Sequence, residues 1–287
     1  MNRRDFIHTT ALTAAGIVAL PAVNSFAKTS QAGGIIDVNV TLGRWPFRRL
    51  PWDEVGKLVA GLRRQGVTQA WAGSFEAVLD KDLRAANARL ATQCRQQGRG
   101  LLVPFGSVNP RLPDWEAEFT QCVEEHHMPG LRLFPGYHGY KLGDENFSKL
   151  FARAVARKLI LQIAADLEDE RLQRKEATAP HTDAKPLLAL LKATPGARVV
   201  LLNGQRSIAA ALVPQLAAAG AHFDIATVES VGGVGELIGK ISVERVLFGS
   251  HAPFFYVESA LLKLKESAVS GLTWRSVSEL NARRLLG

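Results

Sequence analysis

Polar residues close several short apolar segments of the 287-residue chain, and they are the first candidates for chemistry. The residues concerned are Asn39, Thr41, Gln162, Asn203, Ser250 and His251. Amides, hydroxyls and an imidazole can hold and polarise a polar substrate, whereas a hydrolytic metal ion is held by His, Asp or Glu side chains. The pattern predicts a polar pocket with a lining unlike that of a metal site, in which His251 is the first candidate for a functional residue.

Two arginines accompany these residues. Arg132 lies between Leu131 and Leu133, so we expect its side chain to point inward, where burial would oblige it to find a partner. That partner is either a substrate carboxylate, which a guanidinium binds through two parallel hydrogen bonds, or a structural acid such as Asp37. Arg44 follows the segment 35–40 and is expected either to hold an anionic group or to be an ordinary surface arginine.

A glycine-flanked segment, 135–140, contains Tyr137 and His138. An unperturbed histidine titrates near neutral pH, so His138 is a candidate general acid or base, with Tyr137 beside it as a substrate contact. The alternative for His138 is an exposed loop residue without a role.

The elements that must position these residues follow a regular order. Eight short segments are aliphatic or β-branched without strict alternation, which is typical of strands buried on both faces. They span 35–40, 68–73, 101–107, 130–134, 159–164, 198–202, 222–226 and 245–249. Helical patterns separate them, including 52–65, 81–97, a helix opened by Pro113, 146–157, 183–192, 207–219, 231–240, 257–267 and a terminal helix at 276–286.

Strand and helix in eightfold alternation predict an α/β protein, a single-domain (β/α)8 TIM barrel over residues 35–287. An open doubly wound sheet is the alternative, but it usually carries a glycine-rich phosphate loop after its first strand, and residues 41–45 contain none. In a barrel the carboxyl ends of the strands meet in one pocket.

Composition excludes several other classes. The formal net charge is +8, but the basic residues alternate with acids, so we expect no nucleic-acid partner. The two cysteines, Cys94 and Cys122, do not form a disulfide framework and are expected to be buried thiols.

The first 27 residues have the order of an export signal. Arg3 and Arg4 precede an apolar stretch, and Ser25 and Ala27 place small residues at the positions that a signal peptidase requires. The adjacent arginines indicate the twin-arginine export machinery as a partner and a periplasmic destination, with cleavage after Ala27 and a linker at 28–34. A membrane anchor is the alternative, although the stretch is short for a span, and no other segment is long and apolar enough.

Three segments together resemble the amidohydrolase superfamily, in its amidohydrolase-related branch. Residues 36–43 are similar to the opening strand of that family, 248–253 to its eighth-strand motif and 281–286 to its closing helix. The resemblance implies one or two bound metals, held by a first-strand His pair, a His on each of strands five and six, and an Asp on strand eight. The corresponding residues of this chain are Asn39, Thr41, Gln162, Asn203 and His251. Amides and hydroxyls are poor ligands for a zinc-type ion, so we expect no metal cofactor, although the resemblance itself implies one.

These observations lead to a first functional expectation: an exported hydrolase of a small, carboxylate-bearing lactone, ester or amide that works without metal. Arg44 and Arg132 would hold the anion, His251 or His138 would activate water, and the amides would orient the substrate. The alternatives are a decarboxylase-type lyase, a barrel that binds a ligand without turnover, and a metal hydrolase with ligands relocated to His138, His181 and His251.

Overall fold

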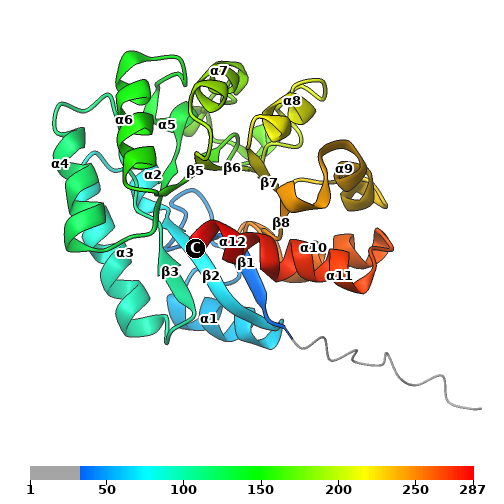
Figure 1. Cartoon of the computed structure of the whole chain (residues 1–287). Coiled ribbons are helices and arrows are strands. Elements are labelled where there is room, and N and C mark those ends of the chain that lie inside the picture. Colours follow the sequence, from blue (N-terminus) through cyan, green and yellow to red (C-terminus); the bar gives the residue numbers. More distant parts are fainter. Residues whose placement is uncertain (1–32) are drawn as a thin grey trace, which may run out of the picture. The chain divides into compact units, whose positions relative to one another are not determined.

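Eight parallel strands surround the centre of the molecule (Figure 1). The computed structural model describes residues 33–287, so the expected export signal and most of the linker lie outside the described residues. The strands are β1 (Ile35–Leu42), β2 (Val67–Ser74), β3 (Leu102–Pro104), β4 (Gly130–Leu133), β5 (Ile160–Ala164), β6 (Arg198–Leu202), β7 (His222–Asp224) and β8 (Val246–Leu247).

The strands close into a barrel in chain order. Each strand pairs with the next one along the chain in two hydrogen-bonded groups, β1-β2-β3 and β4-β5-β6-β7-β8, and all these pairings are parallel. A bridge between Gly106 and Leu131 links the first group to the second, and one between Val40 and Ala252 links the last strand to the first. This arrangement confirms the predicted α/β barrel.

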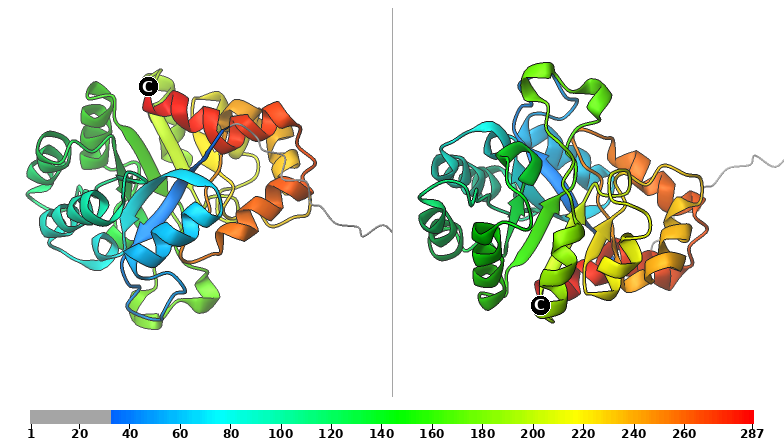
Figure 2. Two further views of the ribbon diagram at one scale, coloured as in Figure 1. Left: turned by 90° about the horizontal axis from the view of Figure 1, so that it is seen from below. Right: turned by 90° about the horizontal axis from the view of Figure 1, so that it is seen from above.

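Helices cover the outside of the strands, as both views of Figure 2 show. They are α1 (Val55–Arg64), α2 (Glu76–Leu79), α3 (Leu83–Gln97), α4 (Trp115–Thr120), α5 (Pro135–His138), α6 (Glu145–Ala156), α7 (Lys185–Ala193), α8 (Val213–Ala218), α9 (Gly233–Ile241), α10 (Val257–Glu266), α11 (Gly271–Arg275) and α12 (Asn281–Leu286). None of these helices among the described residues is long and apolar enough to cross a membrane.

Two of the predicted helices were wrong in extent. The helix expected over 207–219 begins only at Val213, because Pro214 has no N–H to donate and is tolerated only in the first helical turn. The terminal helix expected over 276–286 begins earlier, at Gly271, because α11, a π-helical turn at Ser276–Leu280 and α12 follow one another without a break.

Helix α12 closes the end of the barrel opposite the carboxyl ends of the strands. Ala282 and Leu285 pack into a buried apolar cluster with Val38, Trp71 and Val200 from the strands. Trp71 and Phe105 stack within this cluster, with ring centroids 5.0 Å apart. Any opening for a substrate must therefore lie at the other end.

The two cysteines are confirmed as buried free thiols. Burial raises the pKa of each thiol to about 12, so both stay protonated and unreactive at neutral pH.

Candidate functional site

The guanidinium of Arg132 fills the centre of the barrel. Its Nε donates to Gln162 Oε1 at 2.8 Å. One terminal nitrogen donates to the Val40 carbonyl at 2.6 Å and to Thr41 Oγ1 at 3.3 Å, and the other to the carbonyls of Val38 at 3.1 Å and Trp71 at 2.9 Å. A guanidinium has five N–H donors, and all five are engaged by the protein.

This geometry corrects the expectation that Arg132 binds a substrate carboxylate. The side chain points into the barrel as predicted, but its exposed fraction is 1% and its donors are already used. The alternative partner, Asp37, forms no direct ion pair with Arg132 among the described residues; main-chain carbonyls accept from the guanidinium instead. Arg132 is thus a structural cation of the barrel interior.

Gly73 on β2 makes room for Arg132. A Cβ atom added to Gly73 would lie 2.7 Å from Arg132 Cδ and 2.9 Å from one terminal nitrogen. Such contacts require the buried guanidinium to move away from its acceptors. The observed position of Arg132 therefore requires glycine at position 73.

We expect Gly73→Ala to reduce the free energy of unfolding by about 3 kcal/mol, at the upper end of the cost of overpacking a core. Urea unfolding at pH 7 measures the loss. The control is Gly239→Ala in α9, where an added Cβ has no neighbour within 4 Å. Equal stability of the two variants would contradict the tight fit at Gly73.

Two buried carboxyl groups lie near the guanidinium. Asp37 Oδ1 accepts from the main-chain N–H groups of Asn39 and Ser250, both at 3.0 Å. Asp224 accepts from Asn39 Nδ2 at 2.7 Å and from the Asn203 N–H at 2.9 Å. Burial raises the pKa of each carboxyl to about 6, and these hydrogen bonds oppose that rise.

These raised pKa values predict a pH dependence of stability. A carboxyl whose folded pKa lies above its unfolded value of 3.8 stabilises the fold at low pH, and that contribution is lost as pH rises through about 6. Asp37→Asn keeps an oxygen for the two N–H groups and removes one titration. We expect urea unfolding between pH 4 and pH 7 to show a flatter dependence for this variant, whereas the exposed control Asp114→Asn keeps the wild-type slope. An unchanged slope in Asp37→Asn would be the contrary result.

A cavity of about 200 Å³ opens beside this interior network, at the carboxyl ends of β5, β6 and β8. Its lining comprises Asp166, Leu167, Glu168, Asp169, Glu170, His181, Asn203, Arg206, Thr227, His251 and Phe255. Of the residues predicted for the site, Asn203 and His251 reach this cavity. Asn39, Thr41 and Gln162 lie behind it, buried with Arg132.

Asn203 and His251 hold the loop that follows β5. Asn203 Nδ2 donates to the Asp166 carbonyl at 2.9 Å, and His251 Nε2 lies 2.6 Å from the Leu167 carbonyl. A carbonyl only accepts, so His251 Nε2 carries the proton and Nδ1 is the acceptor. Burial lowers the pKa of His251 to about 4, and the imidazole is neutral at pH 7. Both residues have left-handed backbones, with φ of 57° and 60°, a strain more common at functional sites.

The loop held in this way carries a hydrogen-bonded pair, His181 and Asp166. The sequence did not predict that these two residues lie together. His181 Nδ1 forms a hydrogen bond with Asp166 Oδ1, and His181 Nε2 lies 3.6 Å from a carboxylate oxygen of Glu170. Hydrogen bonding to Asp166 raises the pKa of His181 above its usual 6.5. The next residue, Thr182, bonds to the carbonyls of Ala164 and Ala165 at 3.0 Å, which fixes the other end of the loop.

Arginines around the cavity already contact carboxylates. Arg48 lies 3.2 Å from Glu168, and Arg171 and Arg206 lie 2.6 and 3.1 Å from Asp169. The cavity therefore gains little surplus positive charge from them. The predicted anion-binding Arg44 is exposed and does not line the cavity.

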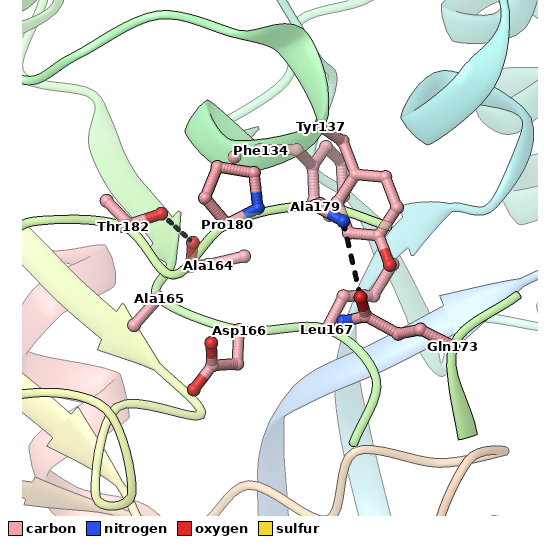
Figure 3. A pocket seen from close by; sticks show the side chains of 11 residues that line it. Phe134, Tyr137, Ala164, Ala165, Asp166, Leu167, Gln173, Ala179, Pro180 and Thr182 are labelled. Atoms are coloured by element: carbon pink, nitrogen blue, oxygen red, sulfur yellow. Dashed lines mark hydrogen bonds between the residues drawn. The ribbon is translucent and has the colours of Figure 1, made fainter. Parts of the chain in front are cut away.

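An aromatic cluster covers the barrel mouth on the other side. Trp45 lies 5.2 to 6.2 Å, between ring centroids, from Phe47, Phe75, Phe254 and Tyr137. Tyr137 also lines a small cavity with Asp166 and Gln173, drawn in Figure 3. Its volume of about 10 Å³ leaves room for one water molecule at most, so Tyr137 lies next to the site without a substrate-sized space of its own.

His138 does not join the cavity. It ends α5, is partly buried, and its Nε2 lies 2.9 Å from the Ala77 carbonyl. Burial lowers its pKa below 6.5. The expectation of His138 as an acid or base loses its geometric support, because the residue packs on α2 and is absent from the cavity lining.

The residues at the implied metal positions do not fit a divalent cation. Thr41 and Gln162 accept from the Arg132 guanidinium, and Asn39 directs both amide hydrogens to Asn203 and Asp224. Over residues 33–287 no three His, Cys, Asp or Glu side chains gather in a group suited to a metal ion. Relocated ligands at His138, His181 and His251 are not supported, since His138 packs elsewhere and His251 Nε2 binds a carbonyl.

Comparison with known proteins identifies both the fold and the family of the chain. Among solved structures, the chain is similar to a 2,6-dihydroxybenzoate decarboxylase from Rhizobium, at 13% identity and a TM-score of 0.69 over 88% of this chain and 98% of that one. It is also similar to a 5-carboxyvanillate decarboxylase from Novosphingobium aromaticivorans complexed with manganese, at 14% identity and a TM-score of 0.69 over 90% and 97%. An uncharacterised TIM-barrel protein from Bordetella bronchiseptica gives 14% identity and a TM-score of 0.67 over 88% and 98%.

At these low sequence identities, the structural similarity establishes the fold alone. No curated protein sequence matches the chain. The model of the family described as amidohydrolase matches residues 48–287, which is most of the chain. The protein therefore belongs to the amidohydrolase family.

Proposed function

We propose that the chain is a hydrolase of small esters or lactones that uses the Asp166–His181 pair, without a metal, to activate water. The observation that carries the proposal is the contact of His181 Nδ1 with Asp166 at the edge of a substrate-sized cavity. An imidazole held by a carboxylate in this way keeps one nitrogen free as a base.

The proton transfers follow from this tautomer. With Nδ1–H donated to Asp166, His181 Nε2 takes a proton from water as the water oxygen attacks the substrate carbonyl. The imidazolium then returns the proton to the leaving oxygen as the carbon–oxygen bond breaks. Arg206 lines the same cavity and uses two of its five N–H donors on Asp169, so a remaining N–H would donate to the oxyanion that forms between these steps.

His251 and Asn203 act in this proposal as positioning residues. They bind the carbonyls of Leu167 and Asp166, and so fix the loop from which the Asp166 carboxylate reaches His181. The low pKa of His251 makes it a weak base, which favours this role over the direct one first expected.

The lining argues for an uncharged substrate. Four carboxylates face or edge the cavity, namely Asp166, Glu168, Asp169 and Glu170, and the nearby arginines are paired with two of them. A substrate carboxylate would meet repulsion without a dedicated arginine. We therefore replace the carboxylate-bearing substrate of the sequence-based expectation with a neutral ester or lactone.

A substrate screen tests the proposal. Protein dialysed against a chelator is assayed with esters, lactones, amides and 2,6-dihydroxybenzoate, beside His181→Gln and the control His127→Asn, which removes an exposed imidazole. We expect ester or lactone turnover that survives chelation, persists in His127→Asn and is lost in His181→Gln. Turnover only after metal is added, decarboxylation of the benzoate, or tight binding without turnover would each replace the proposal, the last by a ligand-binding barrel.

We also propose that residues 1–27 direct export through the twin-arginine route, on the strength of Arg3, Arg4 and the apolar stretch that follows. Replacing both arginines with lysine keeps the charge and should retain the protein in the cytoplasmic fraction of an expressing bacterium. Unchanged periplasmic recovery of that variant would contradict this route.

A further inference from the structure

The residues that match the family's ligand positions are divided between two environments. All five residues have exposed fractions of 2% or less, but of these only Asn203 and His251 line the cavity. The side chain of Arg132 enters the barrel from β4 and bonds to Thr41 and Gln162, whereas Asn39 bonds to Asn203 and Asp224.

The guanidinium contacts two of the four strands that would supply metal ligands, β1 and β5. It bonds to the side chain of Thr41 on β1 and to that of Gln162 on β5, and it also binds the carbonyls on either side of Asn39, those of Val38 and Val40. A fifth bond, to the Trp71 carbonyl, adds β2. One cation thus joins four of the eight strands: β1, β2, β5 and its own strand, β4.

The surroundings are suited to a positive charge. Asp37 and Asp224 are buried nearby and act on Arg132 electrostatically, and five oxygen atoms accept its hydrogens. The missing Cβ of Gly73 provides the space for the side chain. A second cation in this volume would meet a fixed like charge, and the nearby oxygen atoms already accept hydrogen bonds from Arg132.

We propose that Arg132 is a built-in replacement for the metal of this barrel: its guanidinium takes the place between β1 and β5 that a divalent ion takes in metal-binding members, and it excludes such an ion. The charge that joins these strands is then a covalent part of the chain and does not depend on metal supply.

Restoring the missing histidines tests this replacement. One variant carries Asn39→His, Thr41→His and Gln162→His with Arg132 intact, and a second adds Arg132→Ala. Both are dialysed with Mn²⁺ or Zn²⁺, and bound metal is measured by mass spectrometry, with circular dichroism as the check of folding. We expect well under 0.1 equivalents in the first variant and about one in the second. Stoichiometric metal in the first would overturn the proposal.

A second experiment uses the wild-type protein, so its result does not depend on whether the variants fold. A ligand that binds only the folded state raises the melting temperature, by about 5 °C or more when it is far above its Kd. We expect a shift below about 1 °C with 1 mM Mn²⁺ or Zn²⁺. A larger shift that a chelator reverses and that persists in His181→Ala would contradict the replacement. Neither readout uses turnover, so failure of the hydrolytic proposal leaves both tests valid.

Discussion

Replacing Arg132 with Met is expected to lower the free energy of unfolding by about 3–5 kcal/mol, the usual cost of removing one partner from a buried charged network. Methionine has a similar length but donates no hydrogen bond. The carbonyls of Val38, Val40 and Trp71 would lose donors in a place that water does not reach, and each unpaired buried acceptor costs about 1–3 kcal/mol.

Urea unfolding at pH 7 measures this loss. Arg64→Met, an exposed arginine at the end of α1, is the control and should change stability by less than about 0.5 kcal/mol. Arg132→Lys should be destabilised almost as much as Arg132→Met, because an ammonium cannot reach five acceptors in a plane. A loss below about 1 kcal/mol in Arg132→Met would show that the guanidinium contacts do not hold the barrel together.

Replacing His181 with Gln is expected to reduce kcat for the best substrate of the screen by about 10²- to 10⁴-fold, the usual contribution of a positioned general base. Glutamine retains a donor for Asp166 but cannot take a proton from water. Because His181 is exposed, we expect the variant to keep the wild-type melting temperature. Full activity in this variant would remove His181 from the mechanism.

The dependence of activity on pH is a second test of the Asp166–His181 pair. A base must be unprotonated, so activity should rise with pH through the pKa of His181, which the Asp166 hydrogen bond raises above 6.5. Asp166→Asn replaces the charged acceptor of His181 with a neutral amide. The pKa of His181 should then fall, so the rise of activity with pH should begin at lower pH, and the maximal rate should decrease. A profile that moves upward, or not at all, would contradict the pairing.

The barrel was predictable because its strands are continuous apolar segments, which sequence alone displays. Arg132 was also visible as a charge inside such a segment, and the inward direction followed from its apolar neighbours. Its role was not visible, because three of its acceptors are main-chain carbonyls on β1 and β2 and no side-chain pattern records them.

The position of the catalytic candidates was harder to predict for a related reason. Asp166 and His181 are fifteen residues apart in one loop, and only the bonds of Asn203, His251 and Thr182 to that loop bring them together. An acid just after the fifth strand and a histidine later in the same loop were the available signals. Either residue alone is equally typical of a solvated turn.

An anomalous diffraction map from crystals grown with excess Mn²⁺ tests most directly whether an arginine has taken over from the metal. We predict continuous density for the Arg132 guanidinium against Thr41 and Gln162, and no anomalous peak among Asn39, Thr41 and Gln162. A manganese peak at that position, with Arg132 turned away, would contradict the account.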